Sequence, residues 1–273
     1  MTHINLEIYN KRHKALSDIW RRKGYEEAIW FRLNVSSHTK RVVIITRELC
    51  SVLEKLWISV NRDYILALAE VHDDDEIITD DLAITIKDRF SEDEKDLHEK
   101  HKIEAIQELS NKYGALFENI WLYEQLLKEE TKENSLEFSI MKYVDKLEAL
   151  MEVCQEIWAG NKNFIILHNN EKDFEINSFE YAFKSAKKHL WIISELINIP
   201  IEELEKFDIC NLRKLQNYRY ISENTPWFTD EKSFRSLASN FPPYEKRKTL
   251  LLENLPEEEK KKLREQSPFL ILK

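Results

Sequence analysis

Glycine and proline are scarce in this chain, with three and six residues respectively among 273. This scarcity argues against glycine-rich phosphate loops and against multi-stranded sheets joined by tight glycine turns. Leucine, isoleucine, glutamate and lysine are abundant instead, and this composition favours helices. We therefore expect an all-α fold, with a length that suits one large domain or one domain and an appendage.

Cysteine is also scarce, and its three residues are Cys50, Cys154 and Cys210. They are widely separated, and no pair has the CxxC spacing of a zinc ribbon. An odd number of scattered cysteines does not support a disulfide framework either. We expect all three to be buried as small apolar side chains.

Long apolar runs and basic patches are missing as well. No run approaches the roughly 20 residues that a membrane span needs, and residues 1–14 lack the apolar region of a signal peptide. The formal net charge is −9, and the short basic runs at 21–23 and 260–262 are flanked by acids, so a long nucleic acid would be repelled. We expect a soluble, cytoplasmic protein whose partners include neither a membrane nor a long nucleic acid.

Hydrophobic periodicity predicts helices along most of the chain. From 39 to 57 apolar residues recur every three or four positions, and His38 continues the inward stripe formed by Val42 and Ile45. Ser36 and Ser37 are expected to cap this helix. The same pattern predicts helices at 63–71, 82–90, 92–112, 115–128, 135–158 and 178–196, and another that starts at Pro200.

Two further helices carry polar residues on their apolar faces. His72 extends the inward face of the 63–71 helix, and Asp73 follows it directly. Asp145 lies on the most apolar helix, 135–158, with Phe138 and Met141 at helical spacing. A carboxylate in such surroundings is costly unless a positive group meets it.

These residues form a candidate metal site from three separate helices: His38, His72, Asp73 and Asp145. Two imidazoles and two carboxylates suit a borderline divalent ion such as Mn, Fe, Co, Ni or Zn, with positions left for water. Metal-bound water has a pKa lowered towards neutrality and can attack a phosphorus centre as hydroxide. The native metal, Mg included, is not decided by the sequence.

Four blocks of sequence carry a family resemblance: NVSSHT at 34–39, HDDDEIITDD at 72–81, KYVDKLEA at 142–149 and EIWAGNKNF at 156–164. They resemble the HD-domain phosphohydrolases, most closely the bacterial 5′-deoxynucleotidases. The family pattern is NVSEHS, then HDxxExxTGD with a lysine soon after, then an Asp-bearing helix that leads into ExxAGNxF. The resemblance covers roughly residues 15 to 170, in the same order and spacing.

The resemblance implies a role for individual residues. It implies that His38, His72, Asp73 and Asp145 are the metal ligands. Glu76 matches the catalytic acid, which orients the attacking water or protonates the leaving oxygen. Asp81 matches a residue that assists catalysis and contacts the nucleotide sugar, and Lys87 matches the lysine after the second block.

An arginine–tryptophan pair that binds phosphate and selects deoxyribose precedes the first histidine in the resembled family. Arg22 with Tyr25 is the preferred match here, and an insertion or deletion would make Arg32 the match instead. An arginine facing a phosphate is chemically expected, because its fork matches two phosphate oxygens. These residues and Lys87 are the predicted substrate ligands.

The second block departs from the family pattern in two ways. Asp80 stands where the family has glycine, so a different turn backbone is expected. Asp74 and Asp75 add negative charge beside the site, where they could attract a second cation, although solvated side chains are the expected outcome.

The predicted function is a metal-dependent phosphohydrolase that releases phosphate from deoxynucleoside 5′-monophosphates. One alternative is a dNTP triphosphohydrolase, with basic residues such as Arg213, Lys214 and Arg219 near the pocket. Another is an HD-type di-iron oxygenase, for which His98 and His101 could supply extra ligands. The third is a degenerate HD scaffold that binds a nucleotide or a partner protein.

The domain organisation expected is an HD phosphohydrolase domain at 1–200 and a helical C-terminal extension at 201–273, packed on the core or on a partner. The partner expected is a small-molecule nucleotide substrate. Dimers are common in the resembled family, which suggests a homodimer, while the sequence itself leaves the oligomeric state open.

Overall fold

The computed structural model describes residues 4–22, 29, 31, 33–82, 90–117, 120–129, 135–158, 161, 164, 178–213 and 215. The chain divides into two compact units, 1–222 and 223–273, and every described residue belongs to the first. The described part contains helices and two isolated antiparallel bridges, Ile4–Phe117 and Trp20–Asn34, but no strand. The prediction of an all-α fold is confirmed.

Most predicted helices are present with nearly the expected bounds. The elements are α1 (Leu6–Ser17), α2 (Val35–Lys55), α3 (Arg62–Val71), α4 (Glu76–Thr79), α6 (Glu92–Tyr113), η1 (Gly114–Leu116), α7 (Ile120–Glu129), α8 (Leu136–Trp158), α9 (Ser178–Ile197), α10 (Ile201–Leu204) and η3 (Asp208–Cys210). The sequence pattern did not single out α1. Of the helix predicted at 82–90, residues 83–89 lie outside the described residues.

The predicted capping of α2 by Ser36 and Ser37 is wrong. Asn34 is the N-cap: its backbone is extended, and its side-chain oxygen accepts a hydrogen bond of 2.9 Å from the backbone N–H of Ser37. An asparagine at this position satisfies an otherwise unpaired amide of the first turn. The helix therefore starts earlier, and His38 lies within its first turn rather than before it.

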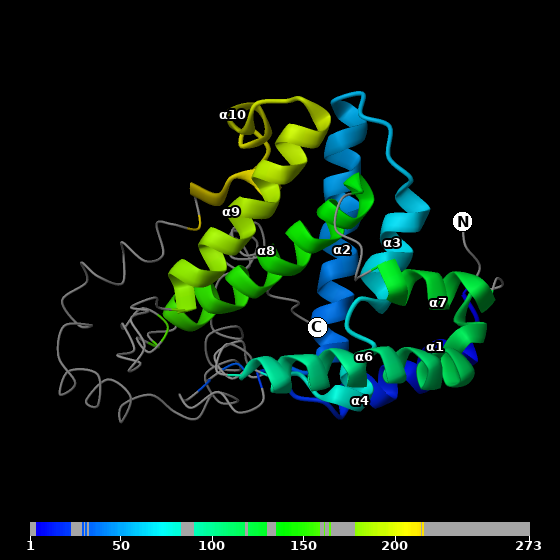
Figure 1. The fold of residues 1–273 in the computed structure, drawn as a ribbon. Coiled ribbons are helices and arrows are strands. Elements are labelled where there is room, and N and C mark those ends of the chain that lie inside the picture. Colours follow the sequence, from blue (N-terminus) through cyan, green and yellow to red (C-terminus); the bar gives the residue numbers. More distant parts are fainter. Residues whose placement is uncertain are drawn as a thin grey trace, which may run out of the picture. The chain divides into compact units, whose positions relative to one another are not determined.

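Helices α2, α3 and α8 contact one another and form the centre of the described unit (Figure 1). Side chains of these helices that are fully or almost fully buried include Leu49, Leu68 and Tyr143. Burial of each such side chain stabilises the fold by about 2 kcal/mol relative to exposure. The contact among the three helices can therefore hold buried polar side chains in fixed positions. Helix α9 runs along α8 and covers it with its own apolar stripe.

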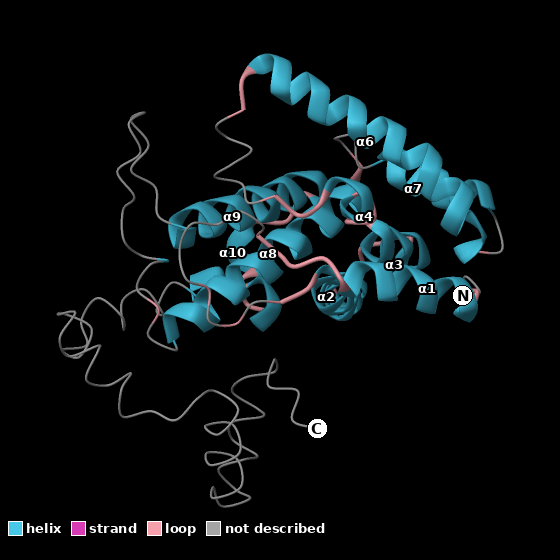
Figure 2. Cartoon of the chain, turned by 90° about the horizontal axis from the view of Figure 1, so that it is seen from below, coloured by secondary structure: helices cyan, strands magenta, loops and turns pink. Residues whose placement is uncertain are grey.

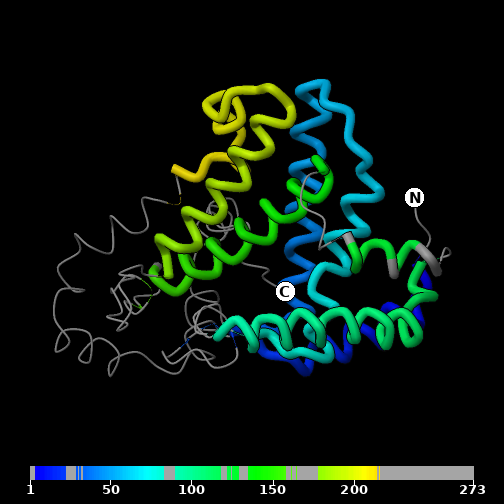
Figure 3. Tube along the Cα trace, in the orientation of Figure 1, coloured from blue at the N-terminus to red at the C-terminus, as the bar shows by residue number. Residues whose placement is uncertain are grey.

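Helices α6 and α7 form an outer pair joined by η1. Helix α6 begins with a capping box between Ser91 and Glu94, contacts α4, and lies at the outer edge of the helices (Figure 2). The chain then turns back through α7, which packs beside α3, as the trace in Figure 3 shows. Helix α1 contacts α2 and α4, so the N-terminal helix also supports the central three.

Residues after α9 pack back onto the same unit. Leu204, Cys210 and Leu212 are buried, and the Tyr143 hydroxyl donates to the Ile209 carbonyl at 3.1 Å. Of the predicted extension at 201–273, only 201–213 and 215 are described. Among the described helices, none is both long and apolar enough to cross a membrane. The three cysteines are free and buried, as predicted.

Candidate metal centre

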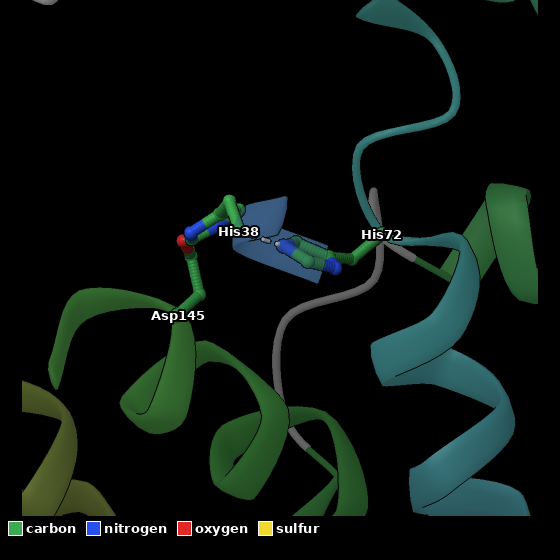
Figure 4. A group of neighbouring side chains, drawn as sticks. All are labelled: His38, His72 and Asp145. Carbon is green, nitrogen blue, oxygen red and sulfur yellow. Dashed lines mark hydrogen bonds and ion pairs between the residues drawn. The ribbon is translucent and has the colours of Figure 1, made fainter. Parts of the chain in front are cut away.

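The structure brings together side chains from α2, the end of α3 and α8. His38 lies in the first turn of α2, His72 caps the C-terminus of α3, and Asp145 lies near the middle of α8. One ligand atom from each of these three lies within 4.8 Å of the others, and Figure 4 shows the side chains directed towards one another. All three residues are buried, which agrees with the inward faces that periodicity predicted.

Asp73 joins this cluster from the turn after α3. Its Oδ2 lies 3.3 Å from His38 Nε2 and 3.2 Å from His72 Nε2. His38 Nε2 is also 3.2 Å from His72 Nε2 and 3.4 Å from Asp145 Oδ1. The two imidazole nitrogens therefore face each other and two carboxylate oxygens across a space the size of one ion.

The other nitrogen of each ring is already bound. His38 Nδ1 lies 2.6 Å from Glu148 Oε2, and His72 Nδ1 lies 2.8 Å from the Ala69 carbonyl. Both partners are acceptors, so both rings carry a proton on Nδ1 and direct Nε2 towards the cluster. Backbone or carboxylate partners of this kind are what metal-binding histidines normally have.

The donor set fits a divalent metal. Two ligands bound at about 2.1 Å to one ion are about 3.0 to 3.4 Å apart in octahedral or tetrahedral geometry. The separations around His38 Nε2, 3.2 to 3.4 Å, fall in this interval. Two imidazole nitrogens and two carboxylate oxygens converge on one space, and a cation with nitrogen and oxygen ligands satisfies all four.

The electrostatics of the cluster also favour a cation. Burial would raise the pKa of Asp73, but the charge of His72 and the hydrogen bond with His38 hold that pKa well below its usual value. Burial likewise opposes ionisation of Asp145, and Lys146, 2.8 Å from its Oδ2, helps to hold its pKa well below the usual value. Both carboxylates are therefore ionised at neutral pH and available as ligands.

Glu76, the first residue of α4, lies at the edge of the cluster. Its Oε2 is buried and has no hydrogen-bond partner. Burial and the neighbouring charges of Asp73 and Asp81 raise the pKa of Glu76 well above its usual value. A carboxyl group in this state can hold a proton and deliver it to a leaving oxygen.

Asp81 is buried beside the same turn. Its Oδ2 accepts a hydrogen bond of 3.1 Å from the Arg22 backbone N–H and lies 3.9 Å from Arg21 Nε. Asp80 before it has φ 62° and ψ 153°, a conformation that glycine adopts most easily. An aspartate therefore adopts a conformation typical of glycine at the position where the resembled family has glycine.

Arg21 is a functional candidate that the sequence interpretation missed. Its guanidinium lies 3.6 Å from Asp73 Oδ2 and 3.4 Å from Glu152 Oε2, in addition to its contact with Asp81. An arginine at the rim of a metal centre is placed to bind phosphate oxygens. The adjacent pair Arg21-Arg22 was visible in the sequence as two possible phosphate ligands. The sequence pattern does not indicate which of the two side chains points towards the metal centre.

Arg22, one of the predicted substrate ligands, is the next residue after Arg21 in the chain. Its guanidinium donates to Glu152 at 3.2 Å and stacks over the Phe164 ring at 5.3 Å from the centroid. Its φ is 58°, so the backbone turns sharply between the two arginines. Of the other predicted substrate ligands, Tyr25, Arg32 and Lys87 lie outside the described residues.

A column of buried acids on α8 was also missed. After Asp145 come Glu148, Glu152 and Glu156, at intervals of three, four and four residues, and all are buried. Glu156 accepts from the Phe31 backbone N–H at 2.6 Å and from Asn161. The sequence contained a signal for this column, because four acids at intervals of three and four residues lie on one face of a helix.

The expectation that Asp74 and Asp75 are solvated is wrong. Asp74 is fully buried and is bound by Arg12 Nε at 2.6 Å and by the Tyr123 hydroxyl at 2.5 Å. Asp75 is 7% exposed and lies 3.4 Å from Lys102. Both acids face other helices because the turn after α3 is enclosed by α1, α6 and α7.

A small pocket that is partly open to solvent lies beside Arg21 and Glu152. Its lining residues are Arg21, Arg22, Ile29, Phe31, Leu33, Glu152, Gln155 and Glu156. The guanidiniums, the aromatic ring and the amide give this pocket both polar and apolar walls.

The histidines required by the di-iron alternative are not part of the cluster. His101 is exposed on α6, and His98 is half-buried against Phe90, with ring centroids 5.8 Å apart. Within the described residues, the groups that could hold a metal include neither of them. This arrangement argues against a second iron ligated by these two side chains.

Comparison with known proteins gives the family. A profile described as 5′-deoxynucleotidase YfbR-like matches residues 17–182, which is more than half of the chain. The chain belongs to the YfbR-like family. The family resemblance seen in the four sequence blocks is thereby confirmed.

Curated relatives of this YfbR-like chain carry phosphatase names. It is 30% identical over 134 residues to 5′-deoxynucleotidase YfbR of Escherichia coli, covering 49% of this chain and 65% of that enzyme. It is 25% identical over 193 residues to 4′-phosphooxetanocin A phosphatase of Priestia megaterium, covering 69% and 87%. The aligned part thus spans slightly less than two thirds of the Escherichia coli enzyme.

Solved structures give the same fold. An HD-domain phosphohydrolase from Listeria innocua matches 88% of this YfbR-like chain and 100% of its own, with a TM-score of 0.51 and 18% identity. A conserved hypothetical protein from Pyrococcus furiosus matches 77% and 99%, with a TM-score of 0.52 and 18% identity. The helical arrangement is therefore that of the HD domain, as predicted.

Proposed function

We propose that this protein is a metal-dependent phosphohydrolase that removes phosphate from deoxynucleoside 5′-monophosphates. The observation that carries the proposal is the convergence of two imidazole Nε2 atoms and two carboxylate oxygens on one ion-sized space. The names of two relatives, 5′-deoxynucleotidase YfbR and 4′-phosphooxetanocin A phosphatase, support a phosphate monoester as the substrate.

In this proposal His38, His72, Asp73 and Asp145 hold the divalent metal, with Mn, Co, Fe, Mg and Zn as candidates. The metal, when bound, lowers the pKa of a water ligand and so supplies a nucleophile at neutral pH. The chain contributes the remaining chemistry through its own side chains, each at a definable position around the cluster.

Glu76 holds a proton, because its environment disfavours the charged form, and gives it to the leaving sugar oxygen. Arg21 binds the phosphate oxygens in place of part of its present contact with Glu152. Asp81 contacts the nucleotide sugar. Arg22, Tyr25, Arg32 and Lys87 stay proposed substrate ligands.

The test is a panel of nucleoside mono- and triphosphates assayed with the purified protein loaded with each candidate metal. We expect inorganic phosphate from deoxynucleoside monophosphates in a metal-dependent manner. Release of triphosphate from dNTPs would replace the proposal by a triphosphohydrolase. Bound metal with no hydrolysis of any nucleotide would leave the degenerate scaffold as the function, and oxygen consumption would indicate an oxygenase.

The proposal also includes the oligomeric state, the cellular location and the domain division of the protein. We propose a homodimer, which light scattering after size exclusion tests directly, and a cytoplasmic location, which fractionation of the native cells tests. We also propose a domain division into 1–200 and a helical extension at 201–273. The packing of Leu204 and Cys210 against the helical core supports an extension whose first part rests on the core.

A further inference from the structure

Glu148 is an acid of the column on α8, and each of its two carboxylate oxygens has a partner on α2. It is 1% exposed, and it follows Asp145 by three residues, so both side chains lie on one face of the helix. Its Oε2 lies 2.6 Å from His38 Nδ1, and its Oε1 accepts from Arg41 at 3.0 Å. His38 and Arg41 are themselves three residues apart on α2, so two i,i+3 pairs face each other across the helix contact.

A carboxylate at this depth requires compensation. Burial of an ionised acid is costly unless it is paired and hydrogen-bonded, and here each oxygen has its own donor. An apolar residue would fill this space between α2 and α8 with less cost. The acid is therefore better explained by what it does to His38 than by the packing of the two helices.

We infer that Glu148 is a positioning residue that holds the His38 ring with Nδ1 protonated and Nε2 aimed at the metal centre. The inference rests on the proposed function, since it assigns His38 to a metal. A carboxylate acceptor on the far nitrogen of a metal-binding histidine fixes the tautomer, orients the ring and raises the basicity of the ligand.

Direct ligation by Glu148 does not explain the same contacts. His38, Glu148 and Glu152 lie close enough together to be considered as a metal-binding group. Glu148, however, meets the Nδ1 edge of the ring, whereas His72, Asp73 and Asp145 meet the Nε2 edge. One ion cannot use both edges of one imidazole, so Glu148 lies behind the ligand rather than beside it.

Arg41 has a defined part in this arrangement. It occupies Oε1 of Glu148 and leaves Oε2 to His38. The arginine therefore prevents the carboxylate from rotating away from the ring. It lies at the surface end of the pair, with 21% of its side chain exposed, so its removal should be milder than removal of the acid.

The experiment compares Glu148→Gln and Arg41→Gln with the wild-type full-length protein. Glu137→Gln serves as the matched control, because it places the same substitution on α8 more than two turns before Asp145. Affinity for Mn²⁺ and Zn²⁺ is measured by chelator competition, and thermal unfolding is measured on the metal-free proteins. Metal affinity is calculated per folded molecule, so a variant that unfolds can be distinguished from a variant that is folded but binds the metal less tightly.

We expect Glu148→Gln to lower metal affinity about 10- to 100-fold, Arg41→Gln to lower it less, and Glu137→Gln to leave it unchanged. Wild-type affinity in folded Glu148→Gln would overturn the inference while leaving the proposed function intact, even if the metal-free protein melted earlier. Failure of the wild-type protein to bind either metal would overturn the proposed function, and the inference with it.

Discussion

Asp73 and Asp74 are consecutive residues, yet their carboxylates enter two different charged environments. Asp73 faces the Nε2 atoms of two imidazoles, each of which binds another acceptor through Nδ1. Asp74 faces Arg12 and Tyr123, which both donate to it. The two neighbours therefore distinguish a site that needs a cation from a network that is complete.

The network around Arg12 is balanced by the protein itself. Arg12 is fully buried and donates to Asp74, to Glu70 Oε1 at 2.7 Å and to the Glu70 carbonyl. Glu70 also meets His13 at 2.7 Å, and His13 reaches Ser36 at 2.9 Å. These bonds tie α1, α2 and α3 together, directly behind the turn that carries the metal ligands.

The contrast between Asp73 and Asp74 shows how buried charged residues that hold the fold together can be distinguished from those that form a metal site. Buried charge that is matched group by group fixes the positions of helices, whereas buried imidazoles and carboxylates that converge on one space indicate a missing cation. Composition alone cannot make this distinction, because both clusters use the same residue types within one short segment.

The largest effect should come from removing an acceptor of the metal centre. Asp145→Asn takes one anionic ligand from the cluster, so we expect metal affinity to fall steeply and phosphate release to drop to background. Chelation of the wild-type protein should give the same loss, with activity restored by added metal. Asp96→Asn, an exposed acid on α6, is the control, and wild-type activity in Asp145→Asn would refute the ligand assignment.

Glu76→Gln should break catalysis without breaking the metal centre. Glutamine cannot hold or deliver the proton, so we expect kcat to fall about 10²- to 10⁴-fold, a typical contribution of general acid–base catalysis. Metal content, measured by plasma emission, should stay at the wild-type level. Loss of the metal together with activity would instead make Glu76 part of the ligand set.

In the metal-free state, Glu76→Gln should become more stable relative to the wild-type protein as pH rises. Because the folded-state pKa of Glu76 is raised, its contribution to stability is present below the unfolded value and is lost as pH increases through the folded value. Glutamine does not ionise, so its advantage in unfolding free energy should be larger at pH 8 than at pH 5. Urea unfolding at the two pH values measures this, and an equal difference at both would contradict it.

Arg12→Met should damage the balanced network rather than the chemistry. It leaves Asp74 and Glu70 buried without their main donor, which typically costs about 3–5 kcal/mol of unfolding free energy. Lys11→Met is the control, because Lys11 is exposed beside it and pairs only with Glu7 among the contacts described. A loss below about 1 kcal/mol for Arg12→Met would show that the network is not a structural lock.

Asp80→Gly should have the smallest effect, and in the stabilising direction. The Asp80 backbone lies in a region that glycine occupies without steric cost, and such strain is worth about 1–3 kcal/mol. Part of that gain is offset by the greater freedom of glycine in the unfolded chain, so about 1 kcal/mol is expected. Unchanged or lower stability in urea unfolding would contradict this account of the turn.

Local periodicity was enough to predict the helices and the inward direction of the candidate ligands. His38 could be placed on the buried face of α2 and Asp145 among apolar residues on α8, because both assignments depend on neighbours within two turns. Their metal-binding role stays a prediction until an ion is measured. Arg12 could not be placed in this way, because its partner Asp74 is 62 residues away.

The sequence by itself therefore determined the helical fold, the family and the residue types of a metal centre, since these depend on short-range pattern and motif spacing. Only the tertiary structure decided which charges meet: Glu148 with His38 across 110 residues, and Arg21 rather than Arg22 against Asp73. The physical reason is that helical period fixes the face on which a side chain lies. The partner it finds there depends on how two helices are packed, and no local pattern encodes that.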